Sequence, residues 1–147
     1  MTSPGKLDSS LDIMQIIYCS HAANSEDKSQ FERDLRDILD HSQAYNPSHD
    51  ITGALTTDGD MFAHVIEGPS VAVANLYAKI MRDKRHDRAL TLQHTLVHVR
   101  LFNLWPMAFL RVGTIRHTRT LDARSAPAEL RRAAIFILKT FRPILLK

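Results

Sequence analysis

The residues with the most evident chemical potential in this chain of 147 residues are its eight histidines and its single cysteine. The histidines are scattered, and none forms a His-x-x-x-His pair on an expected helix. The nearest candidate pair, His94 and His98, shares one face of a strand only if the pleat is regular, and no carboxylate is placed beside it. Cys19 lies in a short apolar run, where a free cysteine usually behaves as a small apolar group. The spacing therefore argues against a metal site and against a cysteine nucleophile.

Motifs for hydrolysis, for phosphate binding and for RNA binding are also missing. No Gly-x-Ser-x-Gly frames a Ser-His-Asp combination, and no two of the five glycines form Gly-x-Gly. RNA recognition on a sheet requires an aromatic platform, which neither Met14–Cys19 nor Leu96–Phe102 provides. Generic motifs therefore indicate no more than an α+β domain with a basic tail, and we expect that it is not an enzyme.

Length and composition favour one domain in a reducing compartment. A chain of this length buries roughly two-thirds of its unfolded surface, and its one cysteine excludes an internal disulfide. No run of about eighteen apolar residues exists, and the N-terminus leads into no signal-type stretch. We expect no membrane span and a cytoplasmic protein.

The positive charge is concentrated in the C-terminal part of the chain. Residues 115–147 hold eight Lys and Arg against Asp122 and Glu129, so this part carries +6 and the remainder about −3 within a net charge of +3. The asymmetry fits a contact surface for acidic protein, membrane or nucleic acid, of which nucleic acid is the least favoured, or a solvated face of an ordinary helix.

Hydrophobic periodicity predicts the elements that must position any site. Met14–Cys19 is too short for a helix and rich in β-branched and aromatic residues, so it predicts a strand. Apolar residues at helical spacing predict a helix from Ser29 to about Ser42, ended by Asn46-Pro47. The later elements are strands Ile51–Thr56 and Met61–Ile66 around a turn at Asp58-Gly59, a helix from Ser70, strands Leu90–Phe102 and Trp105–Val112, and a helix from Pro127.

This order predicts an α+β fold with a ferredoxin-like sheet of about five strands and two helices on one face. We expect a flexible N-terminus over residues 1–12, a domain over 13–113 and a basic helical extension over 114–147. Residues 115–126 are expected to be a flexible connector.

The stretch 42–68 places Ser42 and Asn46 before Ile51-Thr52-Gly53, and Phe62 and Ile66-Glu67-Gly68 follow one hairpin later. This pattern resembles that of the BLUF family, the FAD-binding blue-light sensors. That family places a Ser and an Asn before Ile-Thr-Gly, and Phe-x-Gln-x-Leu-Glu-Gly one hairpin later. The family's Gln falls on His64.

The resemblance covers about residues 13–112. Tyr18 matches the family's tyrosine on the first strand, Arg82–His86 resembles the Arg-Asp-x-Arg-His segment, and Phe102-x-x-Trp105-Pro106-Met107 resembles the last strand. Each residue alone suits a core, a turn or a helix end, but in order and at family spacing they indicate BLUF ancestry together.

The resemblance implies a flavin, FAD with FMN or riboflavin as alternatives, and assigns its site. The implied cofactor-binding residues are Tyr18, Ser42, Asn46, His64, Arg85 and His86. The implied photochemical residues are Tyr18, His64, Trp105 and Met107. In the family, blue light excites the flavin, the tyrosine donates an electron and then a proton, and the glutamine rearranges to shift the flavin absorption to the red.

His64 changes this chemistry, because a neutral imidazole has one donor and one acceptor and no amide to flip or tautomerise. A protonated imidazole, with an unperturbed pKa of about 6.5, would instead present donors on both sides. We expect that the red-shifted state does not form. Thr56-Thr57 and Ala63-His64 also make the hairpin more polar than in the family, which leaves a flavin-free module as an alternative.

Three classes of function follow: a flavin-binding sensor, photoactive or altered; a flavin-free regulatory module; and, least supported, an enzyme. As in other short BLUF proteins, output would pass to an unidentified protein partner. The last helix and its basic flank are the expected contact surface, and we expect a homo-oligomer through the sheet or this helix.

Overall fold

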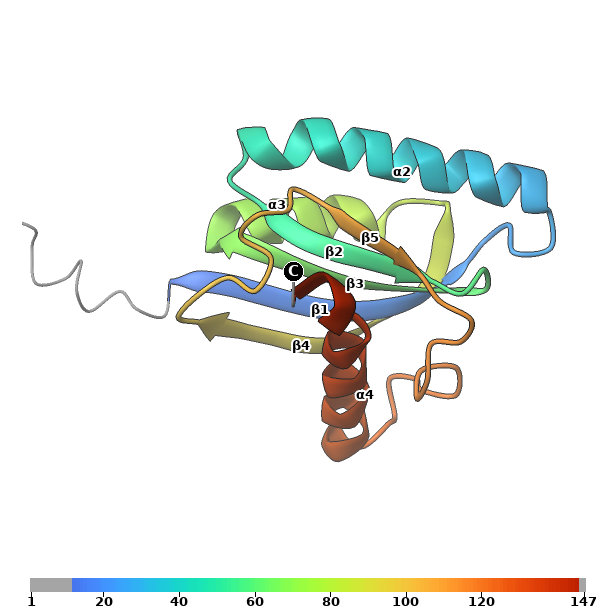
Figure 1. The fold of residues 1–147 in the computed structure, drawn as a ribbon. Helices are drawn as coiled ribbons and strands as arrows, with labels where there is room; N and C mark the ends of the chain where they lie inside the picture. Colours follow the sequence, from blue (N-terminus) through green and yellow to red (C-terminus); the bar gives the residue numbers. More distant parts are fainter. Residues whose placement is uncertain (1–11, 146–147) are drawn as a thin grey trace, which may run out of the picture.

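The computed structural model describes residues 12–145, arranged as a five-stranded sheet with helices on both faces (Figure 1). The strands are β1 (Ile13–Ala22), β2 (Thr52–Thr57), β3 (Met61–Pro69), β4 (His86–Val97) and β5 (Ala108–Arg111). The helices are α2 (Lys28–Ser48), α3 (Ser70–Met81), α4 (Pro127–Thr140) and the short α5 (Arg142–Leu145). The predicted α+β, ferredoxin-like fold with a C-terminal helical extension is confirmed.

The sheet has the strand order β4-β1-β3-β2-β5. The central strands β1 and β3 are antiparallel, and their register places Tyr18 opposite His64. β2 is antiparallel to β3 through a hairpin in which Gly59 has a φ of 95° and the Asp58 carboxylate accepts hydrogen bonds from the backbone N–H groups of Asp60 and Met61. β5 is parallel to β2 and forms one edge of the sheet.

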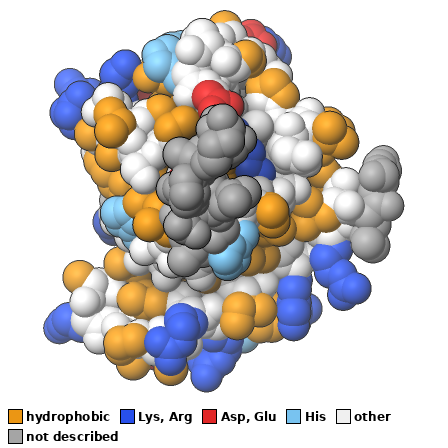
Figure 2. Space-filling view, turned by 90° about the vertical axis from the view of Figure 1, so that its left-hand side faces the viewer, with side chains coloured by type: hydrophobic (Ala, Val, Ile, Leu, Met, Phe, Trp, Pro, Cys, Tyr) orange, Lys and Arg blue, Asp and Glu red, His pale blue; other side chains and the backbone are white. Residues whose placement is uncertain are grey.

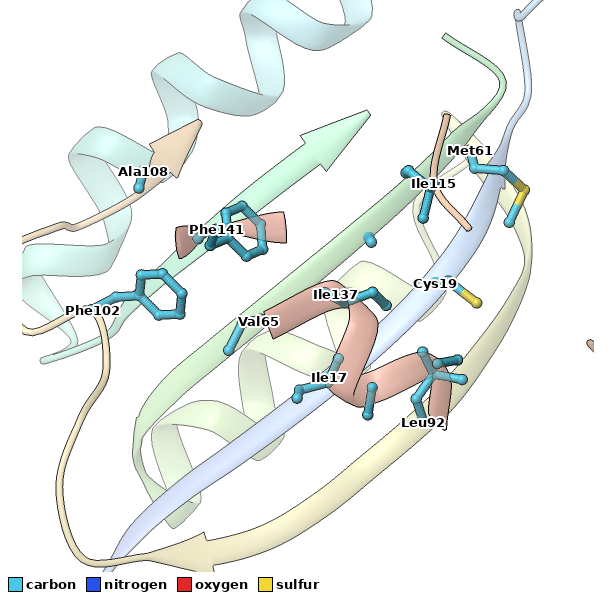
Figure 3. Packing of buried hydrophobic residues seen from close by; sticks show 14 residues of the cluster. Ile17, Cys19, Met61, Val65, Leu92, Phe102, Ala108, Ile115, Ile137 and Phe141 are labelled. Atoms are coloured by element: carbon cyan, nitrogen blue, oxygen red, sulfur yellow. The ribbon is translucent and has the colours of Figure 1, made fainter. Parts of the chain in front are cut away.

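Side-chain alternation along the central strands divides the core into two faces. Ile16 and Tyr18 of β1 pack with Val73 and Leu76 of α3. A neighbouring cluster joins α2 to β2 and β3 on the same face. The opposite face is filled by a larger cluster that α4 covers, and it includes Ile17, Cys19, Val65, Ala133, Ala134, Ile137 and Phe141 (Figure 3). The central strands are apolar on both faces because both faces are covered.

β1 and β3 are longer than the predicted Met14–Cys19 and Met61–Ile66, and three other elements differ more from the sequence prediction. α2 continues through Pro47 to Ser48, because the proline falls in the last turn and the chain leaves the helix only at His49 and Asp50. β4 is displaced toward the N-terminus, from His86 to Val97, so Phe102 lies in the following loop instead of in a strand. β5 has only four residues, since Trp105 and Pro106 precede it in that loop.

The segment between β5 and α4 has no helix or strand, but it is anchored to the sheet. Ile115 and Thr118 are buried, and the Asp58 carboxylate accepts hydrogen bonds from the Ile115 N–H at 3.0 Å and from Arg119 at 3.1 Å. The expected flexible connector is therefore attached to the β2–β3 turn. The predicted N-terminal segment, apart from residue 12, lies outside the described residues.

Within residues 12–145, none of the helices combines the length and the apolarity needed to cross a membrane.

Candidate functional site

A cavity of about 80 Å³ lies over the sheet and between α2 and α3. The sheet supplies its floor through Tyr18, Leu55, Phe62 and His64, and the helices and the following segments supply its walls and rim. The remaining lining residues are Ile38, His41, Ser42, Leu76, Ile80, Asp83, Arg85, His86 and Met107.

The buried pair of Tyr18 and His64 forms the polar centre of this floor. Adjacent antiparallel strands carry the two residues in register, and the Tyr18 hydroxyl lies 2.9 Å from Nδ1 of His64. Nδ1 is the one hydrogen-bond partner of the Tyr18 hydroxyl within the described structure, and a buried donor without an acceptor costs about 1–3 kcal/mol. Tyr18 therefore donates to Nδ1, which puts the imidazole proton on Nε2.

Burial keeps both members of this pair neutral. It raises the pKa of Tyr18 far above that of an exposed phenol, with nearby Tyr77 adding to the shift. Burial is the main cause that lowers the pKa of His64 to about 3, and the charge of nearby His86 is the second cause. The protonated form of His64 considered from the sequence is therefore not the form present at neutral pH, and the Nε2–H group remains as a single donor on its side of the ring.

His86 is held at the first residue of β4 by two hydrogen bonds. Its Nε2 lies 2.6 Å from the Ile80 carbonyl oxygen, which can only accept, so this nitrogen carries a proton. Its Nδ1 lies 2.7 Å from the Ser20 hydroxyl, which donates to it when the ring is neutral. Both nitrogens of this ring are thus bound to protein atoms.

The cation of Arg85 is paired at the rim of the cavity. Its guanidinium donates to Asp83 from Nε at 2.9 Å and from Nη2 at 2.6 Å. The Arg85 hydrogen bond is the chief cause that lowers the pKa of the Asp83 carboxyl. The family resemblance assigned Arg85 to cofactor binding but did not single out Asp83, whose carboxylate compensates the charge of Arg85.

The two polar residues predicted on α2 lie in different surroundings. Ser42 lines the cavity, and its hydroxyl donates to the Ile38 carbonyl oxygen at 2.8 Å, which leaves the hydroxyl oxygen as an acceptor. Asn46 is buried but does not line the cavity, since its Nδ2 donates to the Pro106 carbonyl oxygen at 2.7 Å. In this structure Asn46 holds the loop before β5 and not a cavity ligand.

Trp105 and Met107 are also separated. Met107 is 3% exposed and lines the cavity, and its carbonyl oxygen accepts a hydrogen bond from Gln43. Trp105 is 39% exposed and does not line the cavity. The structure therefore brings together Tyr18, Ser42, His64, Arg85, His86 and Met107 but leaves Asn46 and Trp105 outside.

Sequence reasoning missed most of the apolar walls. Ile38, His41 and Ser42 lie at i, i+3 and i+4 on α2 and so share one face of that helix. The apolar spacing that includes Ile38 could therefore have pointed to Ile38 and to its neighbour His41 as lining residues. Leu76 and Ile80 of α3 belong to the apolar residues at helical spacing that predict the helix from Ser70, but this spacing alone does not say which residues line a cavity.

The chemistry of this lining fits a flat aromatic ligand. Aliphatic side chains form the two helical walls, and hydroxyl and imidazole groups stand at the floor and rim, as in sites for planar cofactors. The space is below the roughly 300 Å³ of a typical small-molecule site, so a three-ring ligand enters only after the wall side chains or the helices move apart. Within residues 12–145, no group of three His, Cys, Asp or Glu side chains is placed to hold a metal ion.

Comparisons with known proteins agree with this fold. The family model described as sensors of blue-light using FAD matches residues 13–108. Photoactivated adenylate cyclase subunit alpha of Euglena gracilis is 38% identical over 74 residues, which make up 50% of this chain and 7% of that subunit. The chain therefore matches only a small part of the length of such cyclase subunits.

Two solved structures are similar over most of the chain. The dark-state structure of BlrB, a BLUF protein, has a TM-score of 0.65 and 26% identity, covering 86% of this chain and 97% of BlrB. Klebsiella pneumoniae BlrP1 with FMN and cyclic diGMP has a TM-score of 0.62 and 24% identity, covering 88% of this chain and 34% of BlrP1. At that identity, the second structure shows likeness of fold alone.

Proposed function

Since the chain belongs to the family of sensors of blue-light using FAD, we propose that the cavity between α2 and α3 holds the ring system of a flavin and that His64 gives the site an altered photocycle. The observation that carries this proposal is the hydrogen bond of 2.9 Å between Tyr18 and His64 on the cavity floor. A bound flavin would supply the absorption of blue light and an acceptor for an electron. The residues of the chain would supply orientation, shielding from water and proton positions.

The proposed binding roles follow from the lining of the cavity. Ile38, Leu76 and Ile80 offer apolar contact to the faces of a planar ring. Ser42, His64 and the rim residues Arg85 and His86 offer polar contacts at its edges. Asn46 would join them only after releasing the Pro106 carbonyl oxygen. Arg85 is already paired with Asp83, so we expect a contact between Arg85 and a flavin phosphate to contribute little to binding. FMN and riboflavin are therefore candidates as well as FAD.

The proposed change in photochemistry follows from the proton positions. The Tyr18 hydroxyl donates its proton in a hydrogen bond to Nδ1 of His64, and Nε2 of the same ring carries the proton that can be donated into the cavity. A glutamine amide can exchange its donor and acceptor ends by rotation, whereas an imidazole in this position keeps Nδ1 toward Tyr18. The chain therefore has no group at position 64 that can reverse its hydrogen bonds, and a red-shifted state is not expected.

Difference spectra before and after blue light test this proposal on the flavin-loaded protein. We expect the wild type to show no reversible red shift and His64→Gln to show one, with Tyr18→Phe combined with His64→Gln as the control that removes it again. A reversible red shift in the wild type would show that the imidazole does perform the switch and would contradict the proposal.

A second candidate function is a flavin-free interaction module, which the small volume of the cavity favours. Titration of the purified protein with FAD, FMN and riboflavin separates the two candidates through flavin absorption and fluorescence anisotropy. A protein that takes up none of the three would exclude the sensor and retain the module.

We further propose that output goes through another polypeptide, by way of α4 and the segment before it. The support is that Asp58 joins the β2–β3 turn next to the cavity strands to residues 115 and 119 of this segment. A homo-oligomer and a cytoplasmic location remain predictions, which size-exclusion chromatography with light scattering and cell fractionation test.

A further inference from the structure

The cations on and directly after α4 lack acidic partners, as do several cations elsewhere in the described residues, but α4 carries only one carboxylate, that of Glu129. Exposed Arg131, Arg132 and Lys139, and Arg142 directly after the helix, form no ion pair within residues 12–145. Six arginines elsewhere are paired with carboxylates, namely Arg85, Arg88, Arg100, Arg111, Arg119 and Arg124.

The single carboxylate on α4 does not compensate this charge. Oε1 of Glu129 accepts a hydrogen bond from the backbone N–H of Ala126 at 2.9 Å and so caps the start of the helix. The negative end of the helix dipole amounts to about half a charge and offsets only a fraction of the cations near Lys139. The outer face of α4 therefore carries an uncompensated positive charge. Lys and Arg side chains gather in the lower part of Figure 2, the level at which α4 lies in Figure 1.

An apolar centre lies among these cations. Ile135 is 52% exposed, and its neighbour Phe136 is half-buried. The His117 ring lies on one side of Phe136, with 4.1 Å between ring centroids, and Nζ of Lys139 lies 5.8 Å from the same ring. Phe136 also borders a hollow whose other lining residues are Thr114, Ile115, Arg116, Ile137, Lys139 and Thr140.

This arrangement distinguishes among anionic partners. The apolar stripe of α4 is already buried on the sheet, through Ala133, Ala134 and Ile137. The apolar surface left outside is limited to Ile135 and part of Phe136, which is too small a face to insert into a lipid surface. A nucleic acid backbone would engage the cations but not an apolar centre. Protein interfaces combine a desolvated aliphatic or aromatic centre with surrounding arginines, as here.

We propose that the outer face of α4, with the hollow beside Phe136, docks an acidic segment of a partner protein. Carboxylates of that segment meet Arg131, Arg132 and Lys139, and its apolar side chains cover Ile135 and Phe136. The proposal rests on the proposed output function for its purpose, but binding at this surface requires no flavin.

Fluorescence anisotropy with a labelled acidic amphipathic peptide of Glu and Leu, about 15 residues long, tests the surface at low salt. We expect Arg131→Glu combined with Arg132→Glu to weaken binding about tenfold, since two exposed ion pairs of modest strength are lost and like charges take their place. Ile135→Ser should weaken binding about fivefold, because the centre loses apolar area. Arg33→Glu combined with Arg36→Glu, an equal charge change on the exposed side of α2, is the matched control and should leave affinity unchanged.

Three outcomes would overturn the proposal: no binding of the peptide, an equal loss in the α2 control, or an unchanged affinity in Ile135→Ser. Tighter binding of a DNA duplex of about 30 base pairs, or of phosphatidylserine vesicles, would also overturn it if the α4 double variant abolished that binding. Circular dichroism confirms that each variant is folded. A protein that binds the peptide but no flavin would refute the proposed sensor and leave this inference intact.

Discussion

Strand β3 buries the polar side chains of His64 and Glu67 on opposite faces of the sheet, and the two differ in how many hydrogen-bond partners they have. His64 faces the cavity, and within residues 12–145 its side chain has a single hydrogen-bond partner, Tyr18, with one ring nitrogen left available. Glu67 is fully buried on the other face, where Leu101 and Phe102 donate from their backbone N–H groups at 2.7 and 3.0 Å. Gln15 and Thr52 are more distant donors to the same carboxylate. A polar group whose hydrogen-bonding atoms are all occupied by protein partners stabilises the structure. A polar group with a free hydrogen-bonding atom next to a cavity is available to a ligand.

The same contrast holds for apolar packing. Phe141 is 0% exposed in the cluster under α4 and meets Phe102 edge to face. Phe62 is 4% exposed and stacks on Phe31, but it also borders the cavity. The α4 face is therefore a filled core, and the α2/α3 face is a core with space in it.

The largest expected effect comes from testing this contrast with matched Phe→Ala variants. Phe141→Ala should destabilise the flavin-free protein by about 4 kcal/mol, because it leaves a new void in a filled cluster. Phe62→Ala should cost about 1 kcal/mol less, since part of its surface already faces empty space. Urea denaturation of both variants measures the difference. A larger loss for Phe62→Ala would show that the cavity face is packed as tightly as the other.

The next prediction concerns the two polar groups of β3. Glu67→Ala should destabilise the fold by about 3 kcal/mol, because the buried N–H group of Phe102 and the part-buried N–H group of Leu101 lose their acceptor. His64→Gln should change the free energy of unfolding by less than about 1 kcal/mol, since the amide still offers an acceptor to Tyr18. Equal losses in the two variants would remove the distinction between a structural and an available polar group.

Sequence reasoning anticipated the local part of this arrangement better than the long-range part. The Asp58-Gly59 turn and the apolar periods of α2 and α3 depend on residues close in the chain, and the predicted elements are confirmed there. The resemblance named Tyr18 and His64, but their direct contact depends on the pairing of β1 with β3, which lie far apart in sequence. Periodicity does not determine such register.

The role of individual polar side chains was harder to predict, because it depends on which acceptor packing brings close. Asn46 was assigned to a flavin by family position, yet a carbonyl oxygen 60 residues away occupies its amide. Glu67 stood in the family motif without an assigned role, and the donors that surround it come from a loop that was expected to be the end of a strand. Charge pairing at Arg85 similarly required knowing the turn geometry of Asp83.

A pH series sharpens the comparison further, because His64 titrates differently in the folded and unfolded states. The folded pKa of about 3 lies below the unfolded value of about 6.5, so between these values the unfolded state binds a proton that the folded state does not. Stability should therefore fall by about 1.4 kcal/mol for each pH unit as the pH drops through this window. Urea denaturation between pH 7 and pH 4 measures this slope, and His64→Gln should lack that contribution. An identical slope in both proteins would show that His64 is protonated when folded.

The smallest expected effect tests whether the two faces are joined at the β2–β3 turn. Burial raises the pKa of Asp58, but the hydrogen bonds from the backbone N–H groups of Ile115, Met61 and Asp60, together with Arg119, outweigh it and lower the pKa. Asp58→Asn keeps an acceptor for the turn but removes the charge that Arg119 meets, so it should cost about 1 kcal/mol. Hydrogen exchange at Ile115 should accelerate while exchange at the Tyr18 and His64 amides stays unchanged, because the cavity strands keep their backbone hydrogen bonds.

Arg124→Ala, which removes an exposed pair with Asp122 within the same segment, is the control and should leave Ile115 protected. Faster exchange at His64 in Asp58→Asn would show that the turn holds the cavity floor as well as the segment leading to α4, and the two faces would then respond as one unit.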